Sequence, residues 1–233
     1  MDWPSPPCPN PGACAPVPAE AVVRRRVTRL LPTLRRAVPN AICALRHRNA
    51  YELIMATILS AQCTDERVNL VTPLLFRKYP VAARLAKAIP GDVERIIKST
   101  GFFRAKTKSL IGCATVLLRD HAGRVPATME DLVRLPGVGR KTANVVLGNA
   151  FGIAAGIVVD THVTRLSHRL GLTRHDDPVK IEQDLMVLIP KSSWIAISHL
   201  LIHHGRRTCM ARNPNCPGCA IRTLCPSAGK VKT

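Results

Sequence analysis

The stretch Leu-Pro-Gly-Val-Gly-Arg-Lys-Thr-Ala-Asn-Val-Val, residues 135–146, decides the fold. Upstream of it, Thr128 followed by Asp131 predicts a helix start. We expect this first helix to end in the Pro-Gly-Val-Gly turn and a second helix to begin at Arg140. The second helix directs three apolar side chains inward: Ala143, Val146 and Leu147. Two helices joined by a short glycine turn form a compact hairpin.

Most of the remaining chain shows the same helical periodicity, from Ala19 to about Arg207. Prolines punctuate the pattern, which is typical of short helices joined by turns. The compact β-branched run Ile157-Val158-Val159 is the one strand signal of note. We therefore predict an all-α protein with roughly ten helices. Residues 1–18 hold seven of the 19 prolines and predict a disordered tail.

Charge narrows the class of partner. The chain of 233 residues has 34 Lys and Arg against 15 Asp and Glu, a net charge of +19. Such an excess favours nucleic acid as the partner, although a solvated basic surface has the same composition. An aromatic content of 3% argues against a stacking platform for single strands. The apolar runs are too short to span a bilayer, and no signal peptide precedes them. We expect a cytoplasmic protein without membrane contact.

Gly137 and Gly139 can bring backbone N–H groups close to a ligand, and they precede the N-terminus of a helix, where an anion is favoured. A DNA phosphate is the obvious anion, and an ordinary helix connection is the alternative. Arg140 and Lys141 then place cations in the first helical turn, where they oppose the helix dipole. Lys141 is therefore a candidate amine nucleophile; alternatively, it binds a phosphate without further chemistry.

Asp160 follows the apolar run and precedes Thr161-His162-Val163. Its simplest role is to cap the helix Thr161–Leu170 by accepting backbone hydrogen bonds. An ionised aspartate beside an apolar wall can also stabilise a cationic transition state, and the two roles are compatible. Nothing in the sequence makes His162 catalytic.

The nine cysteines are unevenly placed. Cys43, Cys63 and Cys113 stand singly in apolar stretches, and we expect them to be buried. Four others lie near the C-terminus with the spacing Cys-x6-Cys-x2-Cys-x5-Cys: Cys209, Cys216, Cys219 and Cys225. On chemistry alone, four thiolates suit Zn²⁺ or a [4Fe–4S] cluster equally well. A zinc ribbon usually has two Cys-x2-Cys pairs, and this segment has one.

Taken together, these segments resemble the endonuclease III family of helix-hairpin-helix DNA glycosylases. The matching stretches are Leu59–Asp65, Leu135–Val146, Val159–His162 and the cysteine quartet, in the family's order and separations. The resemblance covers about residues 22–228. It implies two α-helical domains flanking a DNA-binding cleft. One would be a six-helix domain over residues 41–150 with the helix-hairpin-helix. The other, built from residues 19–40 and 151–233, would carry an iron–sulfur cluster loop.

The resemblance also implies roles for single residues. Lys141 corresponds to the family's nucleophile and Asp160 to its catalytic aspartate. Gln62 corresponds to the glutamine that fills the gap left by a flipped nucleotide. Phe102 corresponds to the wedge that enters the opposite side of the stack, although better-known members have an aliphatic residue there and a core aromatic is the alternative. The quartet corresponds to the ligands of a [4Fe–4S] cluster, with DNA contacts expected at Gly137, Gly139 and Arg140.

The implied function is a bifunctional DNA glycosylase and abasic-site lyase that removes oxidised pyrimidines. Its expected partner is double-stranded DNA with an oxidised pyrimidine or an abasic site. We expect the protein to be a monomer and to act at the bacterial nucleoid. A related adenine-mismatch glycosylase shares the cysteine loop but lacks the hairpin lysine and carries a further C-terminal domain. The sequence ends eight residues after Cys225, which also disfavours that alternative. A non-catalytic iron–sulfur DNA-binding protein would not need the Lys141–Asp160 pair.

Overall fold

The computed structural model describes residues 20–230, and these residues form helices and connecting loops without a strand. The prediction of an all-α fold is confirmed; the predicted disordered tail lies outside the described residues. The α-helices are α1 (Glu20–Ala37), α2 (Ala50–Leu59), α3 (Asp65–Lys78), α4 (Ala82–Leu85), α5 (Pro90–Ile97), α6 (Phe103–His121), α7 (Met129–Val133), α8 (Arg140–Phe151), α9 (Thr161–Arg169), α10 (Pro178–Leu188) and α11 (Trp194–Arg207). Three short 3-10 helices are η1 (Lys98–Thr100), η2 (Lys191–Ser193) and η3 (Arg222–Leu224).

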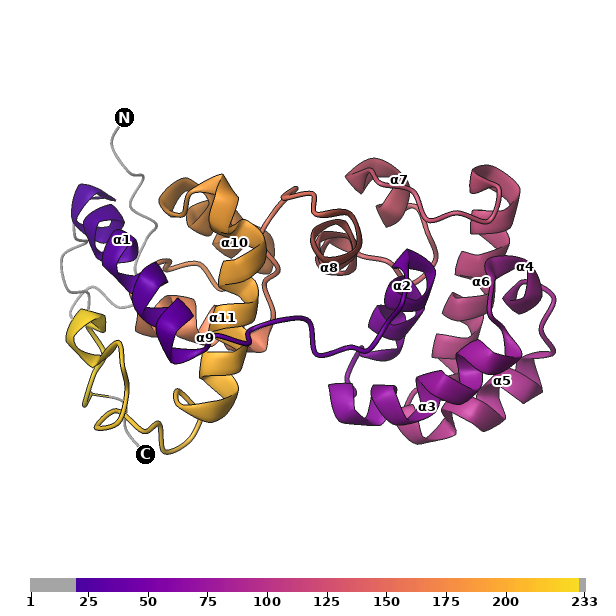
Figure 1. The fold of residues 1–233 in the computed structure, drawn as a ribbon, viewed down its shortest axis with the longest axis horizontal. Helices are drawn as coiled ribbons and strands as arrows, with labels where there is room; N and C mark the ends of the chain where they lie inside the picture. Colours follow the sequence, from indigo (N-terminus) through magenta and orange to yellow (C-terminus); the bar gives the residue numbers. More distant parts are fainter. Residues whose placement is uncertain (1–19, 231–233) are drawn as a thin grey trace. The chain divides into compact units, whose positions relative to one another are not determined.

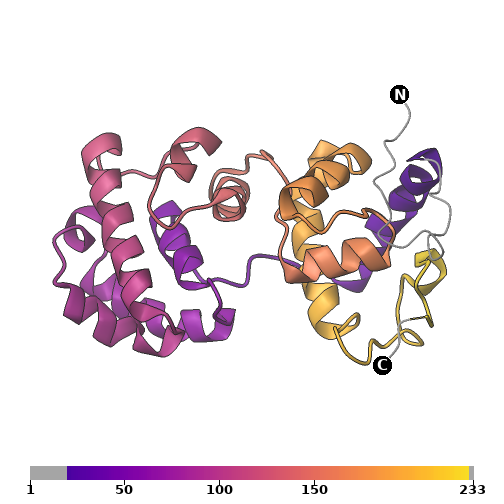
Figure 2. The same ribbon diagram turned by 180° about the vertical axis from the view of Figure 1, so that it is seen from behind.

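The chain divides into two compact units, each with its own hydrophobic core. The first, Cys43–Ala155, is contiguous and contains α2 to α8. The second is formed by the described parts of Met1–Ile42 and Gly156–Thr233, so that α1 packs with the C-terminal helices. Figures 1 and 2 show the same arrangement of helices within each unit from opposite sides.

The core of the contiguous unit surrounds α2, whose residues Glu52 to Leu59 are all buried. The sequence of α2 is almost entirely apolar, and Asn49 fixes its start by accepting a hydrogen bond from the Glu52 backbone N–H at 2.9 Å. On one side α2 packs against α8, and on others it contacts α3 and α6 (Figure 1). The helix that carries Lys141 therefore rests on the most buried helix of its unit.

The discontinuous unit is built around the contact between α9 and α11, with α1 and α10 packed against them. The apolar face of α1 supplies five buried residues to this core: Val23, Val27, Leu30, Leu31 and Leu34. Arg26 on α1 donates hydrogen bonds to the carbonyls of Leu170 and Gly171, just after α9. The N-terminal helix is thus fastened to the same helix that Asp160 begins.

The expectation for the single cysteines is partly wrong. Cys113 is buried on α6, but Cys43 and Cys63 are only half-buried, because both lie in loops that flank α2. Within the described residues no single helix is long and apolar enough to cross a membrane. One pair bent by 120°, Pro178–Leu188 with Lys191–Arg207, meets that test on length and composition alone.

Candidate functional site

The hairpin turn between α7 and α8 adopts a conformation that requires glycine at one position. Gly137 has a φ of +78°, in the left-handed region, and a Cβ added there would lie 2.7 Å from the Cβ of Ser109. Gly139 has an extended backbone and open space around it. It is the N-cap of α8 and provides no side chain to accept the first N–H groups of the helix. The turn therefore leaves the N-terminus of α8 open to an external acceptor.

Lys141 lies in this open first turn and is exposed, as is Arg140. The first turn of α8 contains no acidic residue. On the opposite face Ala143, Val146 and Leu147 are buried, as the sequence predicts. The packing of this face fixes the rotation of α8, and so the surface of the unit on which Lys141 lies.

Asp160 caps α9, as predicted from its position before Thr161. The backbone N–H groups of His162 and Val163 both donate to its Oδ1, at 2.9 and 2.8 Å. The preceding segment is held in place by the Val158 N–H, which donates to the buried Ser198 Oγ on α11 at 3.0 Å. Because both capping bonds end on Oδ1, the cap does not use Oδ2. The carboxylate can therefore cap α9 and still present an oxygen to a cation.

Gln62 and Phe102 both lie in loops of the contiguous unit and both have a left-handed backbone, with φ of +50° and +45°. Gln62 is exposed between α2 and α3. Phe102, between η1 and α6, is 66% exposed, so the alternative that it is a core aromatic is wrong. A left-handed backbone is unfavourable for residues with a Cβ, and such residues gather at functional sites.

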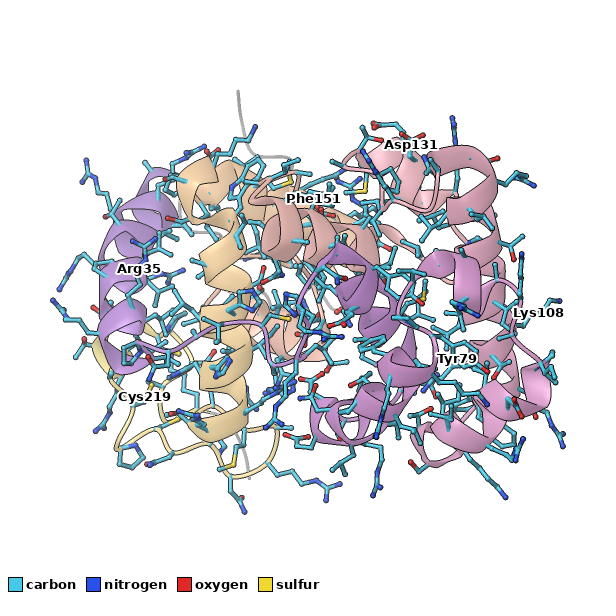
Figure 3. All side chains as sticks on the ribbon, turned by 45° about the vertical axis from the view of Figure 1, so that its right-hand side comes forward. Arg35, Tyr79, Lys108, Asp131, Phe151 and Cys219 are labelled. Atoms are coloured by element: carbon cyan, nitrogen blue, oxygen red, sulfur yellow. The ribbon has the colours of Figure 1, made fainter. Side chains whose placement is uncertain are left out.

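The four clustered cysteines line one cavity in the loop that follows α11. All four are half-buried, and Figure 3 labels Cys219 among them. Burial raises the pKa of the Cys219 and Cys225 thiols, and the charges of the neighbouring cysteines raise it further. A bound cation would stabilise thiolates at these positions. Their sulfur-only donor set fits zinc or an iron–sulfur cluster.

Two side chains from outside the loop reach these sulfurs. Arg169 on α9 approaches Cys209 Sγ at 3.2 Å and also donates to the carbonyls of Met210 and Ala211. His204 on α11, which is buried, has its Nε2 at 3.5 Å from Cys219 Sγ. Neither residue is predicted to lie near the cysteines from the sequence alone. For Arg169, one sequence feature could have indicated a shared role: Arg165 and Arg169 are one turn apart on the helix that Asp160 begins.

The comparisons with known proteins identify the family. Residues 55–191 match the HhH-GPD superfamily of base excision DNA repair proteins. Endonuclease III from Synechocystis is 53% identical over 205 residues, which cover 88% of this chain and 94% of that protein. The chain belongs to the endonuclease III family.

A second member of the endonuclease III family, from Bacillus subtilis, is 45% identical over 193 residues, 82% of this chain and 88% of that protein. The solved structure of a trapped endonuclease III–DNA covalent intermediate matches with a TM-score of 0.84 and 41% identity. The match covers 89% of this chain and 97% of that one. The predicted family and enzyme class are thereby confirmed: this member of the endonuclease III family is a DNA glycosylase and abasic-site lyase of base excision repair. The family generally carries a [4Fe–4S] cluster.

Proposed function

We propose that this enzyme removes oxidised pyrimidines from double-stranded DNA and cleaves abasic sites, with Lys141 as the nucleophile and Asp160 as the electrostatic stabiliser. The observation that carries the proposal is the exposed lysine in the first turn of a helix whose glycine N-cap leaves the N–H groups open. In this arrangement the N–H groups bind a phosphate, and the lysine amine lies beside the nucleotide attached to it.

The DNA is first held through its backbone. The turn at Gly137 and Gly139 and the Arg140 side chain bind phosphates, which position the duplex without reading its sequence. The net charge of +19 supports this role. The damaged nucleotide must then leave the stack, because its C1′ cannot be reached inside a duplex. Gln62 fills the gap and Phe102 enters the stack from the opposite side; the exposure of both side chains supports these roles.

The chemistry begins when the Lys141 amine attacks C1′ and the bond from C1′ to the base breaks, with its electron pair leaving on the base. Asp160 stabilises the positive charge that develops on the sugar. Loss of a proton from nitrogen and opening of the sugar give a Schiff base, which acidifies the C2′ proton. Removal of that proton and departure of the 3′ oxygen complete a β-elimination that breaks the strand. At an abasic site the Lys141 amine attacks C1′ of the sugar aldehyde and water leaves in place of the base, and the resulting Schiff base undergoes the same β-elimination.

We propose that Cys209, Cys216, Cys219 and Cys225 hold a [4Fe–4S] cluster, which supplies a rigid core for the loop between α11 and η3. The four cysteines line one cavity. Their spacing contains one Cys-x2-Cys pair where a zinc ribbon usually has two, which supports an iron–sulfur cluster over zinc. The exposed arginines at the end of α11 and along the segment after it would then face phosphates: Arg206, Arg207, Arg212 and Arg222.

We also propose that the protein works as a monomer at the bacterial nucleoid. Its relatives are bacterial, and one chain provides every residue named in the mechanism. The test of the function is incubation with duplexes that carry thymine glycol or an abasic site, followed by analysis of strand cleavage. We expect both to be cut 3′ to the lesion. Binding without cleavage would favour a non-catalytic DNA-binding protein and overturn the proposal.

A further inference from the structure

The loop that presents Phe102 has a positive φ at two successive residues, and only the second is strained. Gly101 has a φ of +70° and Phe102 a φ of +45°. Left-handed backbone is readily available to glycine but unfavourable for phenylalanine, and the Phe102 ring remains 66% exposed to water. Without contacts from the rest of the protein, this segment would favour neither the left-handed backbone of Phe102 nor the exposure of its ring. Surrounding structure must therefore hold the loop in this state.

Lys106 donates hydrogen bonds to backbone carbonyls on both sides of Gly101. Its Nζ donates a hydrogen bond to the Thr100 carbonyl at 2.8 Å, and its backbone N–H donates to the Phe102 carbonyl at 3.0 Å. The Thr100 hydroxyl in turn donates to the Ile97 carbonyl at 2.8 Å. One residue thus fixes the carbonyls before and after Gly101, and the loop is anchored to η1 and to the first turn of α6.

Lys106 is also buried, with only 5% of its surface exposed. A buried ammonium group is costly unless its hydrogen bonds compensate. Burial lowers the pKa of Lys106, and the charge of the nearby Cys63 thiol acts in the opposite direction. Cys63 directly follows Gln62, which like Phe102 has a left-handed backbone. The hydrogen bonds of Lys106 thus go to the Phe102 loop, and the lyase chemistry assigned to Lys141 does not use this lysine.

We propose that Lys106 is a positioning residue that holds Phe102 outside the core in its left-handed conformation, so that the ring is ready to enter the DNA stack. This inference rests on the proposed role of Phe102. Lys106 contacts the carbonyls that flank Gly101, and it acts on the damaged nucleotide only through Phe102.

The test uses Lys106→Met, which keeps a long side chain but removes the donor to Thr100. A duplex with 2-aminopurine beside the lesion reports extrusion of the nucleotide as a rise in fluorescence. We expect extrusion and base removal to slow roughly tenfold, the equivalent of one lost hydrogen bond, while cleavage of an abasic site changes by less than about twofold. Lys108→Met is the matched control, because Lys108 is an exposed lysine on the same helix (Figure 3).

A double variant separates positioning from a general structural role. If Lys106 acts through Phe102, Lys106→Met in a Phe102→Ala background should cause no further loss of extrusion. Additive losses, or equal losses on both substrates, would overturn the inference. If Phe102→Ala alone leaves extrusion intact, the wedge role itself is wrong and the inference falls with it. If the wild-type protein extrudes the base but does not cleave, only the proposed lyase chemistry fails.

Gly101→Ala gives a second route if the methionine variant does not fold. A Cβ at Gly101 meets no atom within 4 Å, so the substitution changes the backbone preference of the loop without a packing clash. We expect the same selective slowing of extrusion together with a lower thermal midpoint, because a φ of +70° is strained for alanine. Unchanged extrusion in this variant would show that the left-handed loop is not needed, and would overturn the inference.

Discussion

The helices α8 and α9 begin in opposite ways. At α8 the N-cap is Gly139, which offers no acceptor, and two cations occupy the first turn. At α9 the N-cap is Asp160, whose Oδ1 accepts two backbone hydrogen bonds. Both helix ends attract an anion. At α9 the Asp160 carboxylate of the chain itself is that anion, whereas at α8 the N-cap offers none and a ligand can provide it.

In the proposed mechanism, this difference assigns the nucleophile to one unit and the stabilising charge to the other. The open end of α8 suits a place where a DNA phosphate arrives and a lysine amine lies beside it. The closed end of α9 holds a carboxylate in one orientation through backbone contacts alone. The proposed nucleophile, which must approach substrate, and the proposed stabilising charge, which must stay fixed, thus both lie at helix N-termini but with opposite caps. Each of the following substitutions changes the first turn of α8, the cap of either helix, or the support of Asp160.

The largest effect is expected at the open end. Lys141→Gln keeps side-chain length but removes the amine, so borohydride should no longer trap the protein on abasic DNA. We expect a loss of roughly 10⁴-fold or more in cleavage, on the scale seen when an enzyme loses its nucleophile. DNA affinity should change little, because at most one phosphate contact is lost. Arg140→Gln, in the same turn, is the control and should still be trapped. A borohydride-stable adduct with Lys141→Gln would assign the nucleophile to another amine.

The next effect belongs to the closed end. Asp160→Asn keeps most of the cap, because Asn caps a helix about as well as Asp, but removes the charge. Base removal should slow by roughly 10²–10³-fold, while an abasic site is still trapped because Lys141 is intact. Asp160→Ala should show the same loss and also cost about 1 kcal/mol of stability through the missing cap. Single-turnover kinetics and thermal denaturation separate the two roles. Equal activity of the wild type and Asp160→Asn would contradict the electrostatic one.

Installing a cap on α8 tests the comparison directly. At Gly139 the backbone is extended and a Cβ meets open space, so Gly139→Asp is sterically allowed. The new carboxylate should occupy the place of the phosphate and weaken DNA binding roughly tenfold or more, the equivalent of a charge-assisted hydrogen bond worth about 1.5–3 kcal/mol. Stability should stay level or rise by a few tenths of a kcal/mol.

Gly91→Asp is the matched control for charge, since Gly91 is an exposed glycine with open space on α5 of the same unit. It adds the same negative charge away from the hairpin. If both variants bind DNA equally well in a salt titration, the open end of α8 does not hold a phosphate.

The smallest effect concerns the support of Asp160. Ser198→Ala removes the hydroxyl that accepts the Val158 N–H hydrogen bond. The unsatisfied N–H should lower the free energy of unfolding by about 1–3 kcal/mol. We expect the thermal midpoint to fall by roughly 2–4 °C for each kcal/mol lost. Base removal should slow only a few-fold, because the cap of Asp160 remains. Ser192→Ala, at an exposed serine before the same helix, should change neither quantity.

The sequence predicts these helix starts well because capping is a local interaction. Thr128 and Asp160 accept hydrogen bonds from residues two or three positions later, and such contacts follow from spacing alone. The left-handed backbone of Gln62 and Phe102 could not be predicted, since neither is the glycine or asparagine that usually marks it. Burial of Lys106 and the contact of Arg169 with Cys209 depend on tertiary packing. From the sequence alone, Lys106 and Arg169 look like ordinary surface cations.

The discontinuous unit has a consequence for the order of events during synthesis. Its first helix, α1, leaves the ribosome before any other described helix, but its packing partners α10, α11 and η3 are the last of the described helices to emerge. The contiguous unit can fold while translation continues, whereas the apolar face of α1 must wait until these partners have been made. The proposed cluster would have to be loaded after they emerge as well, because Cys225 directly follows η3. A nascent chain therefore cannot complete its set of four thiolates until both units have all of their described helices.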